Sequence, residues 1–467
     1  MASKRSRVPK RLALYLLFVC VPVSSFSGVS AETPASGPIL AQATQATLEI
    51  DTAAIRADPL EEIARNYVLS NDVKGAEQTI QKIRVLYSSQ TPIALMRYGL
   101  EVRSKQLGMV EILARLAADA LKVGLNQWAT EQLNSASAEA YEERDSYARF
   151  VCLLSLMRAY GQLDFLDEKN RMAKEAVRAL EEIYAGDKNE LSRGEGLLAL
   201  AEIELDLGNT GQAQTRLATL ADFVSTIKDR GSKVSILPRL AQLQGRSGNA
   251  EAARATLRDV VKFRIVNGDQ DYRNFANFKN CVDFARTAQM LATGGKIQSA
   301  WQILEESRIM LEAIPVEDQY LRSGAWQKIV MALVALGDLD RAVQSEVHIT
   351  ESSFQVDTRG EIVKGFFESG HTEEAGQLAE RYGLQLELGL LEAKAGHTKQ
   401  AFEILKVFPD SNKPDFLQTK AHLLVHFHGI EKALEWAVRH QSAWRRAFAL
   451  IGISDCLIPI QEHLCRG

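Results

Sequence analysis

The chain has 467 residues, of which 46% are hydrophobic, 24% charged and 7% aromatic, and its formal net charge is −4. This globular composition excludes a collagen, a disordered tail protein and a small disulfide scaffold. No proline lies between Pro92 and Pro238, between Pro238 and Pro315 or between Pro315 and Pro409. Because a sandwich or barrel of short strands needs more turn residues, the sequence favours an all-α protein with glycine turns.

The first 31 residues predict a secretory signal peptide. A basic stretch without acidic residues precedes an apolar run, Leu12–Val23, and small residues follow at Val29-Ser30-Ala31. The alternative is a retained membrane anchor, but the run has 12 residues and contains Pro22, whereas a spanning helix needs about 20. We therefore expect cleavage after Ala31 and a periplasmic or secreted protein with no membrane span after cleavage.

The charge balance argues against a nucleic-acid partner. Without the five basic residues of the signal peptide, the chain carries 50 basic and 59 acidic residues. Binding to phosphates needs a cationic surface, which this balance does not favour.

The next residues divide into a leader and a helical domain. Residues 32–52 are rich in Ala, Thr, Gln and Pro, which is typical of a flexible leader. From residue 53 to 467, apolar residues recur at three- and four-residue spacing, which predicts helices.

Internal repetition is the strongest signal. Six segments share one register: 198–217, 239–257, 286–304, 328–346, 361–379 and 387–405. Each has a glycine at the predicted turn: Gly208, Gly248, Gly295, Gly337, Gly370 and Gly396. Each has an alanine five residues later: Ala213, Ala253, Ala300, Ala342, Ala375 and Ala401. A small or β-branched residue stands seven positions before the glycine, usually after a bulky one. Two flanking copies, 62–80 and 419–437, have Asn71 and His428 at the turn position.

This register indicates stacked helical hairpins. Glycine supplies the positive φ that ends a helix, and the two small residues let antiparallel helices approach closely. A single hairpin cannot bury its faces, so neighbours must stack.

The register resembles the tetratricopeptide repeat, in which a bulky and a small residue are followed twelve positions later by alanine. The resemblance covers eight units, mostly within 198–441, and implies a right-handed α-α superhelix of antiparallel hairpins. Turn-to-turn spacings are 40, 47, 42, 33 and 26 residues, where the family stays near ~34. The family's first aromatic residue and closing proline are mostly absent. Residues 90–190 are expected to be helical without a recognisable register, and a helical hairpin array of another family is the alternative.

The repeat predicts which side chains face a binding groove. Positions six and two residues before the turn are mostly polar across the units. The partner-binding candidates at these positions are Glu202, Asp206, Gln242, Arg246, Gln289, Lys364, Glu368, Lys394, His422 and His426. His422 and His426 also have a metal-ligand spacing, but no HExxH pattern or nearby cysteine accompanies them. The sequence therefore predicts no metal site and no cofactor.

Two aromatic segments are interpreted as packing residues. Phe275, Phe278 and Phe284 recur at a spacing that we interpret as helical, and they are predicted to lie in the core. Trp436 and Trp444 are expected to pack inward while the arginines at 439, 445 and 446 stay solvated. The alternative for this second segment is a partner anchor built from tryptophan and arginine.

The mature chain keeps four cysteines. Cys152 and Cys281 lie in apolar helical patterns and are expected to be buried free thiols. Cys456 and Cys465 flank Pro459, and a turn there would allow a disulfide in an exported protein. This disulfide would tie the chain end to the last hairpin, where an open solenoid has no neighbour. The alternative is two free thiols.

The sequence predicts a binding protein rather than an enzyme. It contains no GxSxG, no phosphate-binding loop and no GxGxxG after a strand. The leading hypothesis is an exported scaffold that binds a protein or peptide in its concave groove. The alternative is an exported α/α-toroid enzyme acting on polysaccharide, and a third possibility is the non-catalytic part of an envelope assembly.

Overall fold

The computed structural model describes residues 36–89, 94–97, 100–104, 106–187, 189–264, 270–408 and 411–458. The chain divides into two units, Met1–Pro34 and Ala35–Gly467. The expected signal peptide and its cleavage site lie in the first unit, outside the described residues. The second unit is described below.

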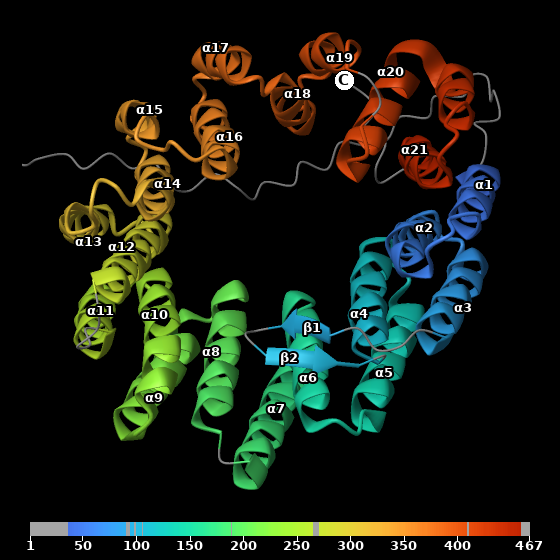
Figure 1. Ribbon diagram of the computed structural model, residues 1–467. Helices are drawn as coiled ribbons and strands as arrows, with labels where there is room; N and C mark the ends of the chain where they lie inside the picture. Colours follow the sequence, from blue (N-terminus) through green and yellow to red (C-terminus); the bar gives the residue numbers. More distant parts are fainter. Residues whose placement is uncertain are drawn as a thin grey trace, which may run out of the picture. The chain divides into compact units, whose positions relative to one another are not determined.

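The second unit is an all-α helical-repeat solenoid. Most helices form antiparallel pairs of neighbours along the chain (Figure 1), and we call the first helix of a pair the A helix and the second the B helix. The A helices are α2 (Ala57–Leu69), α4 (Gln106–Lys122), α6 (Ser146–Gln162), α8 (Glu190–Asp206), α10 (Arg230–Arg246), α12 (Gln270–Thr293), α14 (Gln319–Ala335), α16 (Ser352–Glu368) and α18 (Gln385–Lys394). Their B helices are α3 (Val73–Ser89), α5 (Asn126–Glu142), α7 (Leu166–Asp187), α9 (Thr210–Thr226), α11 (Ala250–Arg264), α13 (Ile297–Glu312), α15 (Leu339–Glu346), α17 (Thr372–Tyr382) and α19 (Thr398–Leu405).

The remaining helices follow the same plan with two differences. α20 (Pro414–Val438) bends at Gly429, so its two parts form a pair within one element. α21 (Ala443–Asp455) is the next A helix, and the helix that pairs with it is α1 (Ser36–Leu48) from the other end of the unit.

Each turn between an A helix and its B helix uses one residue with positive φ. The predicted glycines at 208, 248, 295, 337, 370 and 396 all have φ between 75° and 85°. Asn71, Gly124 and Asp164 supply the same conformation in the first three pairs, with φ of 62°, 80° and 59°. Glycine, asparagine and aspartate are the residues that tolerate this region best.

The alanine five residues after each turn lies where the two helices meet. The six predicted alanines and Ala76 are 0% exposed, and Ala129 has the same position after Gly124. A larger side chain at this point would separate the pair, so the sequence register and the packing agree.

Successive pairs stack through their A helices. Each A helix from α2 to α18 packs against the next A helix, and α18 packs against α20. The series closes on itself, because α21 packs against α20, α1 and α2 (Figure 1). The last pair therefore does have a neighbour, and the expectation of an unaccompanied solenoid end is wrong.

The structure corrects three further expectations. Residues 36–48 of the expected flexible leader form α1, whose Ile39, Leu40 and Ala43 are buried because α21 offers them an apolar face. Two short antiparallel strands, β1 (Ala94–Arg97) and β2 (Leu100–Arg103), lie within a stretch expected to be helical. The tenth turn uses Gly429, with φ 82°, and His428 remains helical.

Candidate functional site: the A-helix face

All ten predicted groove residues lie on A helices and are exposed or half-exposed. They occupy α8 (Glu202, Asp206), α10 (Gln242, Arg246), α12 (Gln289), α16 (Lys364, Glu368), α18 (Lys394) and the first part of α20 (His422, His426). We call the surface that these positions share the A-helix face. It runs across neighbouring A helices, because each packs against the next.

Ion pairs join neighbouring A helices in the middle of this face. Asp206 on α8 pairs with Arg158 on α6 and with Arg246 on α10, the second at 2.6 Å. Glu202 lies 3.0 Å from Arg239 on α10, which also pairs with Glu195. Three of the predicted residues thus hold adjacent repeats together and have little charge left for a partner.

The A-helix face also forms a polar pocket of about 670 Å³ between α2, α4 and α6. Its lining has four carboxylates (Glu61, Glu62, Glu111 and Asp119) and four cations (Arg65, Arg115, Lys122 and Arg158). Most of these charges are paired: Arg65 with Asp119 at 3.0 Å, Arg115 with Glu61 at 2.5 Å and Lys122 with Asp119 at 2.6 Å.

Glu62 differs from the other carboxylates of this pocket. Burial raises the pKa of Glu62, and the nearby Asp455 and Glu61 raise it further, while Arg65 lowers it. A carboxyl group of this kind holds its proton to higher pH than an exposed one.

His422 belongs to the junction between the last and first repeats. Its Nε2 lies 2.9 Å from Asp455 Oδ2 on α21, and Asn66 Nδ2 on α2 donates to Asp455 Oδ1 at 2.5 Å. Asn66 Nδ2 also donates to Ser454 Oγ at 3.0 Å. Asp455 therefore links three A helices. Among the described residues, no group of three or more His, Cys, Asp or Glu side chains is placed to hold a metal ion.

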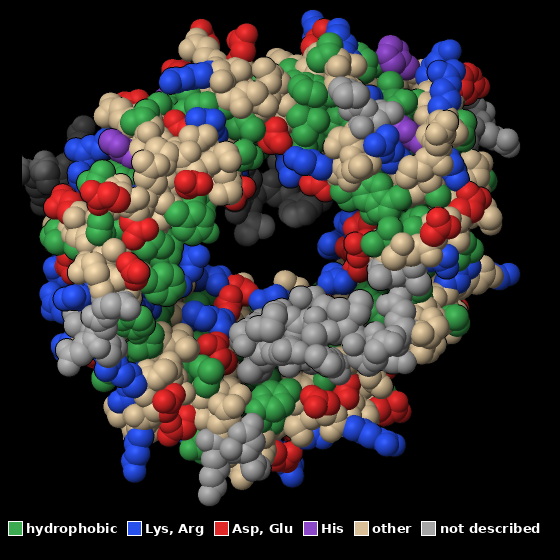
Figure 2. Space-filling view, in the orientation of Figure 1, with side chains coloured by type: hydrophobic (Ala, Val, Ile, Leu, Met, Phe, Trp, Pro, Cys, Tyr) green, Lys and Arg blue, Asp and Glu red, His purple; other side chains and the backbone are tan. Residues whose placement is uncertain are grey.

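From α12 to α16, the A-helix face carries exposed aromatic side chains. Phe275 and Tyr320 are exposed, and Arg286 is exposed three turns after Phe275 on α12. Figure 2 shows hydrophobic side chains gathered over α12 and α14, with Lys and Arg side chains close by. The prediction that Phe275 belongs to the core is wrong, whereas Phe284 is 1% exposed and does belong to it. Nine residues separate the two, which places them on opposite sides of a helix with 3.6 residues per turn.

The segment with Trp436, Trp444 and the three arginines lies at the contact between α21 and α1. Trp436 and Trp444 are half-buried and pack against the hydrophobic core. Arg446 pairs with Glu49, just beyond α1, and Arg445 Nε donates to Asn412 Oδ1 at 2.7 Å. Only part of the prediction is therefore confirmed, because Arg446 is engaged rather than solvated.

The three described cysteines comprise two free thiols and one disulfide-bonded residue. Cys152 and Cys281 are buried free thiols. Burial raises the pKa of the Cys281 thiol to about 12, and it also raises the pKa of Cys152. Cys456 is disulfide-bonded, but Cys465 lies outside the described residues, so their pairing stays a prediction.

Sequence reasoning missed the residues that pair across repeats. Arg158, Arg239 and Asp455 lie on A helices next to predicted residues, yet none of them stands six or two residues before a predicted turn. The signal that could have found Arg158 is its position six residues before Asp164, which has the positive φ of a turn. The sequence does not mark that turn, because Asp164 stands where other turns have glycine.

Comparison with known proteins gives a weak likeness to helical structures. No protein-family model matches the chain, and no curated protein sequence matches it. Among solved structures, the crystal structure of Ton1535 from Thermococcus onnurineus NA1 is 13% identical, with 71% of this chain and 94% of that chain covered and a TM-score of 0.31. A circular tandem repeat protein with novel repeat topology and enhanced subunit contact surfaces is 14% identical, with 92% and 98% covered and a TM-score of 0.23. The fold assignment rests on the repeat register and helix packing of this chain.

Within the part of the chain that the structure describes, none of the helices is both long enough and apolar enough to cross a membrane.

Proposed function

We propose that the chain is an exported helical-repeat scaffold that binds a protein or peptide on its A-helix face and has no catalysis of its own. The single observation that carries this proposal is the continuous A-helix face, to which every A helix from α2 to α20 contributes. Repeat proteins use such extended surfaces to bind partners.

The distribution of charge along the face supports this function. From α2 to α10, carboxylates and cations pair with one another across neighbouring helices. These pairs stabilise the framework and leave few free catalytic groups. From α12 to α16 the face carries exposed aromatic side chains, which are frequent binding anchors.

Site-specific crosslinking tests the location of binding. A photoreactive amino acid is placed at Gln242 or Gln289 on the A-helix face, and at Arg178 or Lys262 on the B helices as matched controls. Both control side chains are 73% exposed. On irradiation of the mature protein in its native envelope, we expect polypeptide adducts from the first two positions only. Adducts of equal yield from all four positions, or none, would contradict the proposal.

Export is tested separately. N-terminal sequencing of the protein recovered outside the cytoplasm should begin at Glu32, because the small residues end at Ala31. Full-length chain in the soluble cytoplasm would contradict export without bearing on the A-helix face.

One observation favours the enzyme alternative. Glu62, whose pKa burial raises, lies near Asp455 beside the polar pocket of α2, α4 and α6. Glycoside hydrolases use a carboxylic acid with a raised pKa together with a second carboxylate. Release of reducing ends from a panel of polysaccharides by the wild-type protein, abolished in Glu62→Gln, would establish this alternative. Asp455 is already bound to His422 and Asn66, which is why we favour the scaffold.

A further inference from the structure

Four aromatic side chains of the A-helix face, two exposed and two half-buried, form one continuous strip across three helices. On α12, the ring centroids of Phe275 and Phe278 are 6.0 Å apart. Between α14 and α16, those of Tyr320 and Phe354 are 5.3 Å apart. We call these four side chains the aromatic strip.

Gly324 on α14 joins the two halves of the strip. A Cβ atom at this position would lie 3.0 Å from Phe278 Cε2 and 3.4 Å from Phe354 Cζ. Both rings therefore border the bare backbone of Gly324, and the four aromatic side chains run from α12 over α14 to α16 without a gap.

Two side chains of the strip are accessible, while Phe278 and Phe354 are half-buried against the core. Phe275 is 50% exposed and Tyr320 is 59% exposed. An isolated exposed apolar side chain needs no explanation, but a contiguous cluster of them usually marks an interaction site.

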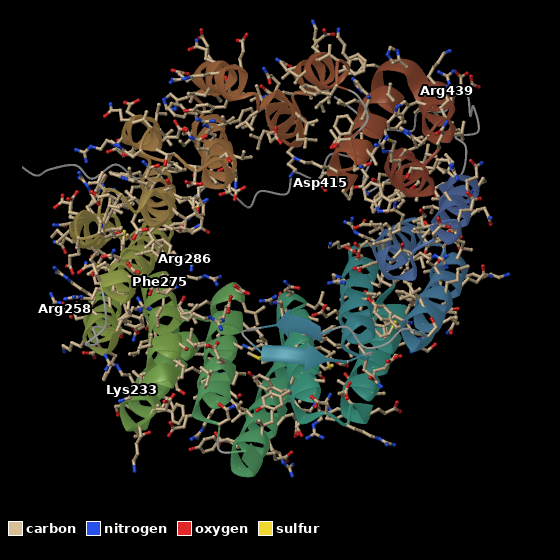
Figure 3. The ribbon with its side chains drawn as sticks, in the orientation of Figure 1. Lys233, Arg258, Phe275, Arg286, Asp415 and Arg439 are labelled. Carbon is tan, nitrogen blue, oxygen red and sulfur yellow. The ribbon has the colours of Figure 1, made fainter. Side chains whose placement is uncertain are left out.

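Cations adjoin the strip, and none of them is paired. Lys279 stands one turn after Phe275, and Arg286 three turns after it, so both share its side of α12. Figure 3 labels Phe275 and Arg286 on this helix, which places Arg286 about 16 Å further along its axis at 1.5 Å per residue. Lys328 stands one turn after Gly324 on α14. Of the residues that the structure describes, none forms an ion pair with Lys279, Arg286 or Lys328, whereas the cations of the face from α2 to α10 named above are all paired.

The positive charge lies on the side of the strip toward the ends of α12 and α14. On the other side, Asp271 stands one turn before Phe275, and Asp318 accepts a hydrogen bond from Asn274 Nδ2 at 3.3 Å. Asp283 interacts with Lys279 and Arg286, but it is buried and pairs with Arg264 at 2.8 Å. Asp357 on α16 offsets part of the charge at Lys328. Burial and the neighbouring Arg286 lower the pKa of Lys328, which is the direction expected where cations gather without enough counter-charge.

We propose that the aromatic strip, with Lys279, Arg286 and Lys328, binds a peptide segment in which aromatic or large aliphatic side chains adjoin aspartate or glutamate. The contiguous rings suit apolar side chains, and the unpaired cations suit carboxylates. This inference deepens the proposed scaffold function and rests on it, because it names where on the A-helix face the partner sits and what chemistry it carries.

The test uses a phage-displayed library of random 12-residue peptides, selected against the mature full-length protein. We expect the enriched peptides to combine aromatic or large aliphatic residues with Asp or Glu. Their dissociation constants are then measured by fluorescence polarisation on synthetic copies. In Phe275→Ala and in Arg286→Glu the dissociation constant should rise at least about tenfold, which is the size expected for an interface anchor. High salt should weaken binding to the wild type, because it screens charges near the surface.

Two matched variants control for general effects. Arg258→Glu makes the same charge change on an exposed arginine of the B helix α11, and Figure 3 labels it apart from Arg286. Ile309→Ala removes a side chain of α13 that is 67% exposed. Both should leave the dissociation constant unchanged. Circular dichroism melting of every variant checks that the fold is retained.

The outcomes separate this inference from the broader proposal. Enriched peptides that bind Phe275→Ala and Arg286→Glu as tightly as the wild type would overturn the aromatic strip as the site, while the scaffold function would stand. Enrichment without acidic residues would overturn the charge argument. No enrichment at all, or preferential binding of uronic-acid oligosaccharides to the strip, would overturn both the peptide inference and peptide binding as the function.

Discussion

At the scale of single residues, the alanine after each turn sets how closely an A helix and its B helix approach. Ala253 on α11 is 0% exposed, so Ala253→Leu should destabilise the fold by about 1–3 kcal/mol through overpacking. Ala255→Leu in the same helix is the control, because Ala255 is exposed. Urea unfolding of both variants measures the difference. Equal stability of the two would mean that the assigned register is wrong.

One unit replaces this alanine with a lysine. Lys169 stands five residues after Asp164 and is 2% exposed, and its Nζ donates to Glu204 Oε2 on α8 at 3.0 Å. Asn209 also donates to this carboxylate, and Arg216 lies 3.5 Å from it. The pair links α7 to the next A helix through a buried contact, as Arg264 on α11 does with Asp283 on α12.

Removing one partner of this buried pair should cost more than removing both. Lys169→Ala leaves the Glu204 carboxylate without its closest cation, and we expect a loss of about 3–5 kcal/mol. The double variant Lys169→Ala/Glu204→Leu carries the residues common at these positions in other units, such as Ala253 and Leu291. It should therefore unfold at a higher urea concentration than the single variant. A double variant less stable than Lys169→Ala would show that the pair is a net source of stability.

At the scale of elements, α21 packs closely against the backbone of α20 at Gly452. A Cβ atom there would lie 2.7 Å from Gln418 Cα and 2.8 Å from its carbonyl oxygen, both backbone atoms of α20. Backbone cannot move aside as a flexible side chain can, so Gly452→Ala should cost about 1–3 kcal/mol. Gly376→Ala in α17 is the control, because a Cβ atom meets nothing within 4 Å there. The control should gain up to about 1 kcal/mol from helix propensity. Differential scanning calorimetry should move the two melting temperatures in opposite directions.

The elements show what the sequence could and could not predict. Gly208 and Gly248 identified their turns because positive φ is costly for most residues. The α6–α7 pair was not predicted, because Asp164 replaces glycine at the turn and Lys169 replaces alanine five residues later. Helix α1 was missed because its apolar face gains a partner only from α21, at the other end of the unit. Such a contact leaves no local signal.

The sequence predicted which helices carry the candidate residues, but it did not predict the ion pairs that these residues form. The register placed Asp206 and Arg246 on A helices, but their pairing depends on how neighbouring helices are rotated, which sequence spacing does not give. Phe275 was assigned to the core because it recurs with Phe284 in a helical segment. Their separation of nine residues instead puts one on the A-helix face and the other inside.

At the scale of the whole described unit, its two ends complete one repeat together. α21 is an A helix without a following B helix in the described chain, and α1 fills that place. Arg446 with Glu49, and Asn66 with Asp455, add polar contacts across the same junction. Each end therefore covers apolar surface that the other would expose to water, and the stability of the first and last repeats should be coupled.

This coupling gives a prediction that point variants can test in the full mature chain. Leu40 on α1 is 0% exposed, so Leu40→Ala should destabilise the junction by about 2–5 kcal/mol. Leu48→Ala is the matched control, because that side chain is 41% exposed in the same helix. Hydrogen exchange followed by mass spectrometry should show faster exchange in α1 and α21 together in Leu40→Ala, while α9–α11, which do not contact the junction, keep their protection. Faster exchange in α1 alone would show that α21 does not depend on it. Unprotected α1 amides in the wild type would contradict the closing contact itself.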